Sequence, residues 1–445
     1  MLWLTLQQLK SKSPRRRKRA VQKLRRLGNA DVVEPLIEAL KDPEQEVRQA
    51  AAEALGEVRD PRAGPPLLSA LRDTATPVRE SAIDALKRIG SREAIAPLVE
   101  ALRESNTSIR WRMAQTLKSL GWQPKSEEEN ATFLVALGEL ERAAMLGKAA
   151  VKPLAELLKE SAYPKRVAAV DLLGEIGDPS TVPPLLTALN DSDPFLRRAA
   201  ANALGHMGRT ETVGPLISTL KDPDPNVRGA AANSLGMLAD HRAVQPLIQL
   251  LRDGHWEVRV EATEALGLLK SPEALGPLLG CLRDEDKEVR AEAARALGEL
   301  GDPGCVEALV NALVEPDVGV RQAAARALTK VSPCWEQSPA AREATPNVWA
   351  ALRQKDPAVQ FAAAEVLRRL GESPSTAPPL PDKREAAIST LIELLRDPDP
   401  DLRRTAVQSL ARLAGRRAAP DLETALGDPD GTVRQAATAA LKTLQ

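Results

Sequence analysis

An arginine recurs every 31 residues over long runs of this 445-residue chain, in most units directly after an aliphatic residue. Allowing three insertions, the register comprises thirteen units, and every unit except the one with Gln360 has arginine at this position. A fixed step of this length is the signature of a repeat array, in which each unit packs only against its neighbours. We call these arginines the anchors: Arg17, Arg48, Arg79, Arg110, Arg166, Arg197, Arg228, Arg259, Arg290, Arg321, Arg403 and Arg434.

Two further positions predict the helix that carries each anchor. Leucine stands seven residues after the anchor in all thirteen units, and alanine stands three residues after it in every unit except at Met113. Residues spaced by four lie on one side of a helix, and the small alanine allows a neighbouring helix to approach closely. We call this predicted element the second helix of each unit.

Asp-Pro pairs predict where the helices begin. The pair six residues before an anchor, as in Asp222-Pro223, is expected to cap the second helix, with the proline at its first position. A different Asp-Pro pair, as in Asp302-Pro303, is expected to open the first helix of the following unit. A proline at a constant position inside that first helix, such as Pro246, is expected to kink the helix or delay its start.

The paired helices, the proline in the first helix and the Asp-Pro and Val-Arg pairs before the second resemble HEAT repeats. The repeat length and the phrase around Gly301-Asp302-Pro303 are similar to the phycobilisome-lyase-type HEAT-like subgroup. This resemblance covers nearly the whole chain. It implies an all-α fold, an α-α superhelix of the armadillo/HEAT-like solenoid kind with about thirteen two-helix repeats.

An acidic residue stands six residues before the anchor in eleven units, as Asp284 does before Arg290. The resemblance implies that these acids and arginines form a structural ladder that links the loop ends of adjacent units. The unit with Gln360 also has Gln354 at the acidic position. We expect the acid and the arginine to be replaced together, because a buried charge without its partner is costly.

Three insertions interrupt the period and suggest a division of the chain. We expect N-terminal repeats with a basic first repeat in residues 1–120, a helical insert in residues 121–150, regular repeats in residues 151–332, and C-terminal repeats with two loop insertions in residues 333–445. Ser126 and Glu129 form a capping-box signature, which predicts one or two extra helices in the first insertion. Insertions on a solenoid emerge as loops and either contact partners or are merely tolerated.

Composition excludes several classes of protein. Lysine plus arginine and aspartate plus glutamate both total 61, and no window approaches a membrane span. We see no secretory signal, and the three separated cysteines indicate neither a disulfide framework nor a zinc site, so we expect a cytoplasmic protein. The first 26 residues contain ten lysines and arginines and no acid. Five of them form a basic cluster: Arg15, Arg16, Arg17, Lys18 and Arg19.

Positions one, five and nine after the anchor share one side of the second helix, and they vary from unit to unit. The resemblance implies that second helices line a concave groove, so we predict that this stripe contacts a partner. Its residues run from acidic in early units to basic in late ones. The groove candidates are Trp111, Arg198, Asn202, His206, Asn233, Met237, Glu264, Arg326, Lys330, Phe361, Arg369, Arg404 and Arg412.

No catalytic constellation accompanies this stripe. The deoxyhypusine hydroxylases of this repeat class bind iron through His-Glu pairs, whereas the histidines here precede Met207, Arg242 and Trp256. We therefore expect a non-catalytic, monomeric scaffold or adaptor that binds another protein, with no catalytic residue, cofactor or metal. The alternatives are nucleic-acid association through the basic cluster, and a bilin-lyase-like or oxidoreductase-family HEAT protein that assists modification of a partner.

Overall fold

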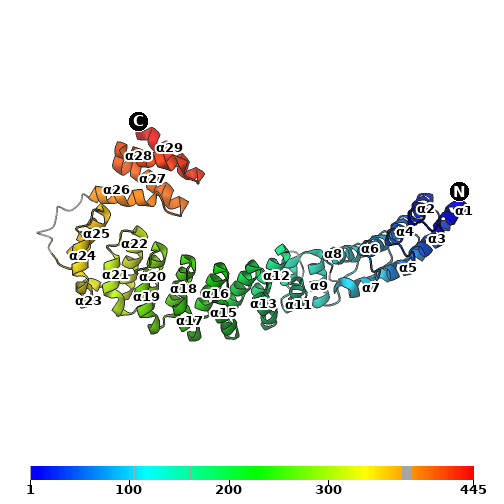
Figure 1. Cartoon of the computed structure of the whole chain (residues 1–445), viewed down its shortest axis with the longest axis horizontal. Coiled ribbons are helices and arrows are strands. Elements are labelled where there is room, and N and C mark those ends of the chain that lie inside the picture. The colour runs from blue at the N-terminus through cyan, green and yellow to red at the C-terminus, as the bar shows by residue number, and fades with distance from the viewer. Residues whose placement is uncertain (1, 104–105, 160–162, 373–382, 445) are drawn as a thin grey trace. The chain divides into compact units, whose positions relative to one another are not determined.

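The computed structural model describes residues 2–103, 106–159, 163–372 and 383–444. These residues form α-helices and short 3-10 helices, and no strand occurs among them. The chain divides into two compact units, Met1–Asp191 and Ser192–Gln445, which we describe separately. Over the regular repeats of each unit, consecutive second helices stack in one layer and the first helices form another (Figure 1). The predicted all-α solenoid is confirmed.

In the first unit, α1 (Leu2–Leu9) precedes the repeats. The second helices are α2 (Pro14–Leu27), α4 (Gln45–Val58), α6 (Thr76–Ile89), α8 (Thr107–Ser119) and α12 (Tyr163–Ile176). The first helices are α3 (Val33–Ala39), α5 (Gly64–Ala70), α7 (Ile95–Glu100), α11 (Lys148–Leu157) and α13 (Val182–Ala188).

In the second unit, the second helices are α14 (Pro194–His206), α16 (Pro225–Leu238), α18 (Trp256–Leu269), α20 (Lys287–Leu300), α22 (Val318–Val331), α25 (Pro357–Arg369), α27 (Pro400–Ala414) and α29 (Gly431–Leu444). The first helices are α15 (Val213–Thr219), α17 (Val244–Leu250), α19 (Leu275–Cys281), α21 (Val306–Ala312), α24 (Thr345–Ala351), α26 (Lys383–Leu394) and α28 (Ala419–Thr424). The short α23 (Pro339–Glu343) lies in the second insertion.

The helix starts differ from the prediction in one respect. Helix α16 begins at Pro225 and is capped by Asp224, whose carboxylate accepts from the backbone N–H of Asn226. The Asp222-Pro223 pair therefore lies in the preceding turn, and the prediction that it caps the second helix is wrong. Asp222 instead accepts from the backbone N–H of Asp224, a local turn that precedes the cap.

The first helices begin as expected. Asp302 accepts from the backbone N–H of Gly304 and starts a 3-10 turn, after which α21 begins at Val306. In α17 the constant proline, Pro246, is the third residue, where no N–H donor is required within the helix. The proline thus delays the α-helix rather than kinking it.

Leucines seven residues after the anchors form the centre of the core. Leu24, Leu55 and Leu86 are fully buried in the first unit, and Leu235 and Leu297 are fully buried in the second. Burying one such side chain contributes about 2 kcal/mol. Because the helices share one register, these contributions repeat along the array.

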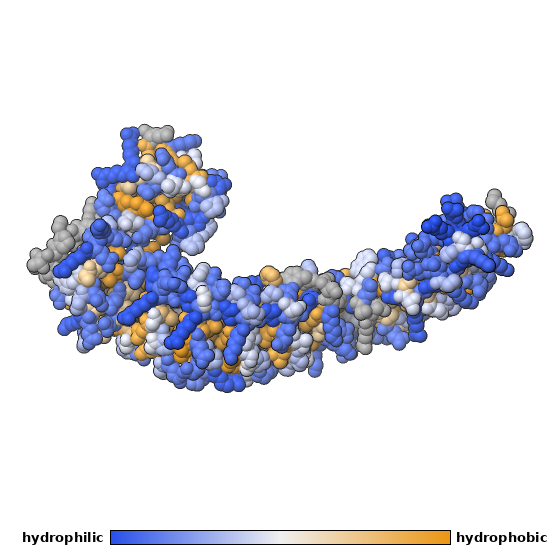
Figure 2. All heavy atoms as spheres, in the orientation of Figure 1, coloured by the Kyte–Doolittle hydropathy of each residue, from blue (hydrophilic) through white to orange (hydrophobic). Residues whose placement is uncertain are grey.

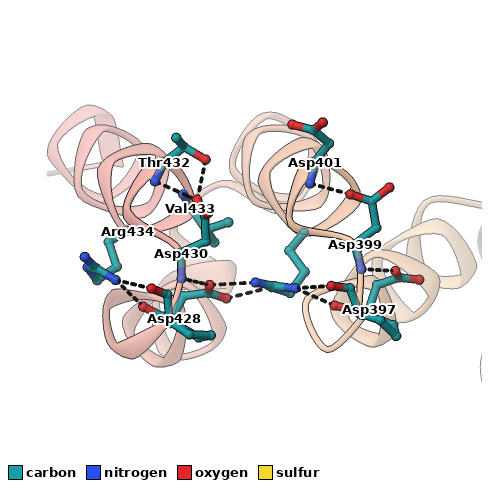
Figure 3. Close-up of polar contacts among 11 residues, drawn as sticks. Asp397, Asp399, Asp401, Asp428, Asp430, Thr432, Val433 and Arg434 are labelled. Carbon is teal, nitrogen blue, oxygen red and sulfur yellow. Dashed lines mark hydrogen bonds and ion pairs between the residues drawn. The ribbon is translucent and has the colours of Figure 1, made fainter. Parts of the chain in front are cut away.

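The acid–arginine ladder has a defined geometry. Arg228 donates from Nη1 to the backbone carbonyls of Asp222 and Pro223, and from Nε and Nη2 to both carboxylate oxygens of Asp253 at 2.7 and 2.8 Å. Each rung therefore joins an anchor to the acid that stands six residues before the next anchor. Arg403 makes the same two-sided contact, to the backbone carbonyl of Asp397 and to the carboxylate of Asp428 (Figure 3). Arg434 then donates to the backbone carbonyl of Asp428, which continues the row.

This pairing corrects our interpretation of Gln354 and Gln360. They are not partners through their side chains, because the rung of Arg321 would end at position 354 and the rung of position 360 would end at Asp397. Gln360 keeps the other half of the contact, since its Nε2 donates to the Gln354 carbonyl at 2.5 Å. The substitutions thus remove two neighbouring rungs rather than both ends of one.

Two of the three insertions are folded into the array. The first contains α9 (Glu127–Leu137) and α10 (Leu140–Ala144), and Ser126 caps α9 by accepting from the backbone N–H of Glu129, as predicted. Trp122 packs edge-on against Phe133, with ring centroids 5.2 Å apart. Most of the third insertion, residues 373–382, lies outside the described residues.

Candidate protein-binding face

The predicted stripe lies on the exposed side of the second helices. In the first unit Trp111 on α8 is 49% exposed, and in the second unit Met237 on α16 is 41% exposed. Large apolar side chains at such exposure are typical of contact points for partners. Elsewhere the visible surface of the second-helix layer in the second unit is mostly hydrophilic (Figure 2).

The acidic part of the stripe in the first unit is neutralised by neighbouring arginines. Arg25 of α2 pairs with Glu57 of α4, and Arg112 of α8 pairs with Asp84 of α6 at 2.7 Å. Salt bridges between exposed side chains contribute little to stability, but they cancel the surface charge. The acidic side chains at these positions are therefore paired within the chain, and the gradient along the stripe stays a prediction.

The middle of the stripe contains a polar recess. Three groove candidates on α14, namely Arg198, Asn202 and His206, lie beside Asn233 of α16 around a hollow of about 520 Å³. Gly229 and Ala230 of α16 also line it, and these small residues leave room for the hollow. A recess of this size with several polar side chains is a suitable place for a partner's polar group.

Hydrogen bonds arrange part of this recess. The ring Nδ1 of His206 lies 2.8 Å from the backbone carbonyl of Asn202, and Asn233 donates to Glu261 at 3.1 Å. Burial, together with the nearby carboxylates of Glu264 and Glu292, raises the pKa of Glu261. Glu264, another groove candidate, is itself exposed on α18. The Glu261 carboxyl in the recess therefore takes up a proton more readily than an ordinary surface carboxylate.

Sequence reasoning missed the residues that close the recess. Asn226, His255 and Glu257 line it, although none belongs to the predicted stripe. Asn226 lies at the beginning of α16, and His255 and Glu257 lie at the beginning of α18, the second helix that packs against α16. The sequence signal that could have identified them is the position of His255 directly before the first residue of α18.

At the basic end of the stripe, some side chains form ion pairs within the chain and others do not. Lys330 pairs with Glu299 at 2.5 Å, and Arg404 pairs with Asp401 at 2.8 Å. Arg326 and Arg412 are exposed and have no carboxylate partner among the described residues. These two arginines thus retain a positive charge that an acidic partner could use.

Arg369 is occupied within the chain. Its guanidinium lies 4.7 Å from the ring centre of Trp335 and forms an ion pair with Glu336. Trp335 is almost completely buried, although it belongs to the second insertion. Arg369 therefore holds this insertion against the end of α25, which makes it less available to a partner than its position suggested.

The basic cluster at the beginning of α2 divides into two sets. Arg17 forms the first rung of the ladder with Asp42 at 2.6 Å, and Lys18 pairs with Glu46 at 2.8 Å. Arg15, Arg16 and Arg19 are exposed and form no ion pair with the described residues. Cations at the N-terminus of a helix oppose its dipole, so this end of α2 attracts anions.

Two kinds of feature are absent from the described parts of the chain. They contain no cluster of His, Cys, Asp or Glu that could hold a metal ion. None of their helices combines the length and the apolar character that crossing a membrane requires.

Stacked two-helix units joined by a buried acid–arginine ladder define an α-solenoid repeat protein. The chain belongs to the HEAT-repeat family, because the HEAT-repeat model matches it almost from end to end. The matched segments are residues 4–87, 64–144, 151–218, 196–254, 213–287, 245–329, 277–344, 307–382 and 380–442. No curated protein matches the sequence significantly.

Several solved structures are similar to this chain. Human deoxyhypusine hydroxylase is 23% identical, with a TM-score of 0.26, over 60% of this chain and 96% of its own. The CpcE–CpcF phycocyanin lyase of Nostoc is 24% identical, with a TM-score of 0.35, over 59% of this chain and 94% of its own. A β-catenin chain from a study of its interaction with cadherin is 17% identical, with a TM-score of 0.40, over 100% of this chain and 99% of its own.

Proposed function

We propose that this protein is a non-catalytic scaffold that binds another protein through the exposed side of its second helices. The observation that carries the proposal is the polar recess on α14, α16 and α18, where Arg198, Asn202 and Asn233 converge on one hollow. Regularly repeated residues serve the scaffold, whereas this recess is built from residues that vary between units. HEAT-type solenoids commonly act as interaction scaffolds through extended surfaces of this kind.

Site-specific photo-cross-linking tests this proposal. A photoreactive residue at Asn202 should capture the same protein in repeated experiments in the native cell extract. The same residue at Gln249, exposed on α17 in the first-helix layer, should not capture it. The Asn202→Ala/Asn233→Ala variant should bind the captured protein at least about tenfold more weakly, the loss expected for one or two hydrogen bonds.

The matched control is Gln245→Ala/Gln249→Ala, which removes two polar side chains from the opposite layer. It should leave binding unchanged. Equal capture at both positions, or equal binding by the two double variants, would reject the second-helix face as the binding surface.

A second candidate is nucleic-acid association through Arg15, Arg16 and Arg19, which are exposed and form no ion pair with the described residues. We expect Arg15→Gln/Arg16→Gln/Arg19→Gln to weaken binding to double-stranded DNA in a gel-shift assay. The slope of log affinity against log salt should fall by about 2 to 3, because three phosphate contacts are lost. Binding with an unchanged slope would exclude this candidate.

A further inference from the structure

The stacking of second helices in the second unit is interrupted at one place. Helices α14, α16, α18, α20 and α22 pack consecutively along their lengths, whereas α22 and α25 do not pack against each other in this way. Ala325 of α22 is consequently exposed. Ala232 and Ala294, at the same position in regular units, are completely buried.

Two substitutions in the repeat accompany the interruption. Regular pairs place glycine eight residues after one anchor against alanine or serine six residues after the next. A Cβ on Gly298 would lie 2.9 Å from the Cα of Ala327, so only glycine permits this approach. Between α22 and α25 the corresponding residues are Thr329 and Val366. Two β-branched side chains at these positions do not allow the close approach that glycine and alanine permit.

The separation leaves an apolar cleft of about 580 Å³. Val318 and Ala325 of α22 form one wall, Phe361 and Val366 of α25 form another, and Leu391 of α26 lies across them. This volume falls within the range of small-molecule sites, which are mostly apolar with a few polar groups that fix orientation.

Arg321, the anchor of α22, is one of the polar residues that line this cleft; the others are Gln322, Glu365, Arg369 and Thr390. The Nη1 of Arg321 donates to the carbonyls of Glu315 and Pro316, as in other units. The edge that elsewhere binds a carboxylate through two hydrogen bonds has no such partner among the described residues, and Gln354 stands at the acidic position. The ion-pair partner of Arg321 among the described residues is Glu393 of α26, 3.9 Å away and without a hydrogen bond, although the Arg321 side chain is only 11% exposed.

Glu393 is also incompletely satisfied. Its Oε2 is buried without a hydrogen-bond partner among the described residues. Burial, together with Asp356 and Asp317, raises the pKa of Glu393, whereas Arg321 and Lys287 act in the opposite direction. Arg321 therefore lines the cleft with a carboxyl oxygen of Glu393 beside it, and neither group has a complete set of hydrogen-bond partners among the described residues.

We propose that this cleft binds a small amphipathic acid, an apolar chain or ring system with one carboxylate. The carboxylate occupies the free edge of Arg321 and restores the bidentate contact that the ladder makes in the other units. The apolar part lies against Ala325, Phe361 and Leu391. This site is separate from the polar recess, and it does not depend on the proposed scaffold function.

Isothermal titration calorimetry of the full chain with decanoate and with decanol tests the proposal. Decanoate should bind saturably and about tenfold more tightly than decanol, because the two probes differ mainly in the charged group that Arg321 binds. The Arg321→Gln variant should reduce decanoate binding to the level of decanol. Gln360 shows that glutamine at an anchor keeps the contact to the carbonyl, so this variant should fold normally.

Three further variants complete the test. Thr329→Gly/Val366→Ala restores the regular contact residues, and it should close the cleft and abolish binding of both probes. Glu393→Gln removes the competing carboxylate and should tighten decanoate binding severalfold. Arg326→Gln alters an exposed arginine of the same helix that does not line the cleft, and it should leave decanoate binding unchanged. Equal binding of decanoate and decanol, unaltered decanoate binding by Arg321→Gln, weaker binding by Glu393→Gln, or no saturable binding would each overturn the proposal.

Discussion

At the scale of single residues, an anchor arginine in a regular repeat stabilises two loops at once. Arg228 binds carbonyls in its own unit and the Asp253 carboxylate in the next, and the two side chains are 13% and 10% exposed. Removing one partner of such a pair leaves a nearly buried charge, which costs more than an exposed salt bridge contributes. The ladder therefore stabilises the packing of adjacent repeats, although its side chains are charged.

We predict that Arg228→Gln lowers the free energy of unfolding by about 3 kcal/mol, because Asp253 loses its charged partner. Chemical denaturation monitored by circular dichroism would measure the change. Arg326→Gln, at an exposed position without an acidic partner among the described residues, should change stability by less than about 0.5 kcal/mol. Equal effects of the two substitutions would show that the rung is not stabilising.

The same rung makes stability depend on pH. Burial alone would raise the pKa of Asp253, but hydrogen bonds from Arg228 and the backbone N–H of His255 hold it below its ordinary value. A lowered pKa in the folded state stabilises the protein above the unfolded-state pKa of about 4. This contribution is lost as the pH falls through the lower folded-state pKa. Denaturation between about pH 6 and pH 3 should therefore show a smaller loss of stability in Arg228→Gln than in the native chain.

At the scale of helices, the distance between second helices depends on the contact residues that they present. Glycine eight residues after the anchor permits close packing, as Gly298 does against Ala327 of the next helix. Arginine at the same position, as at Arg25, projects instead to the surface and pairs with Glu57. The variation at this one position thus modulates packing within an otherwise uniform array.

We predict that Gly298→Ala destabilises the second unit by about 1 to 3 kcal/mol, although alanine favours helices more than glycine does. The new methyl group would lie 2.9 Å from Ala327 and force the two helices apart. Gly280→Ala is the matched control, because a Cβ added at this position inside α19 would meet nothing within 4 Å. Thermal denaturation should show a higher or unchanged midpoint for Gly280→Ala and a lower one for Gly298→Ala.

At the scale of the whole molecule, stability is distributed over many similar local contacts. Each repeat packs mainly on its neighbours, so a local defect should remain local. Hydrogen exchange should therefore increase in α14, α16 and α18 of the Arg228→Gln variant and stay unchanged in α4 and α6 of the first unit. A uniform increase over both units would contradict this picture and indicate a single cooperative transition.

The periodic features of this protein could be predicted from its sequence, because they repeat in many units. Leucine seven residues after each anchor and alanine four residues before that leucine identify one buried helical stripe. Local capping signals also sufficed for α9, where Ser126 and Glu129 interact within one turn. Such features depend on contacts within a unit or on contacts that recur from unit to unit.

Contacts between neighbouring repeats could be identified only from the three-dimensional structure. The sequence indicated the charges of the ladder but not that Arg228 binds Asp253, which follows it by 25 residues. It did not show that Arg369 is held by Trp335, or that Thr329 and Val366 leave a cleft beside Arg321. The physical reason is that a side chain's availability depends on its neighbours across the helix interface, and these neighbours are set by how the units pack.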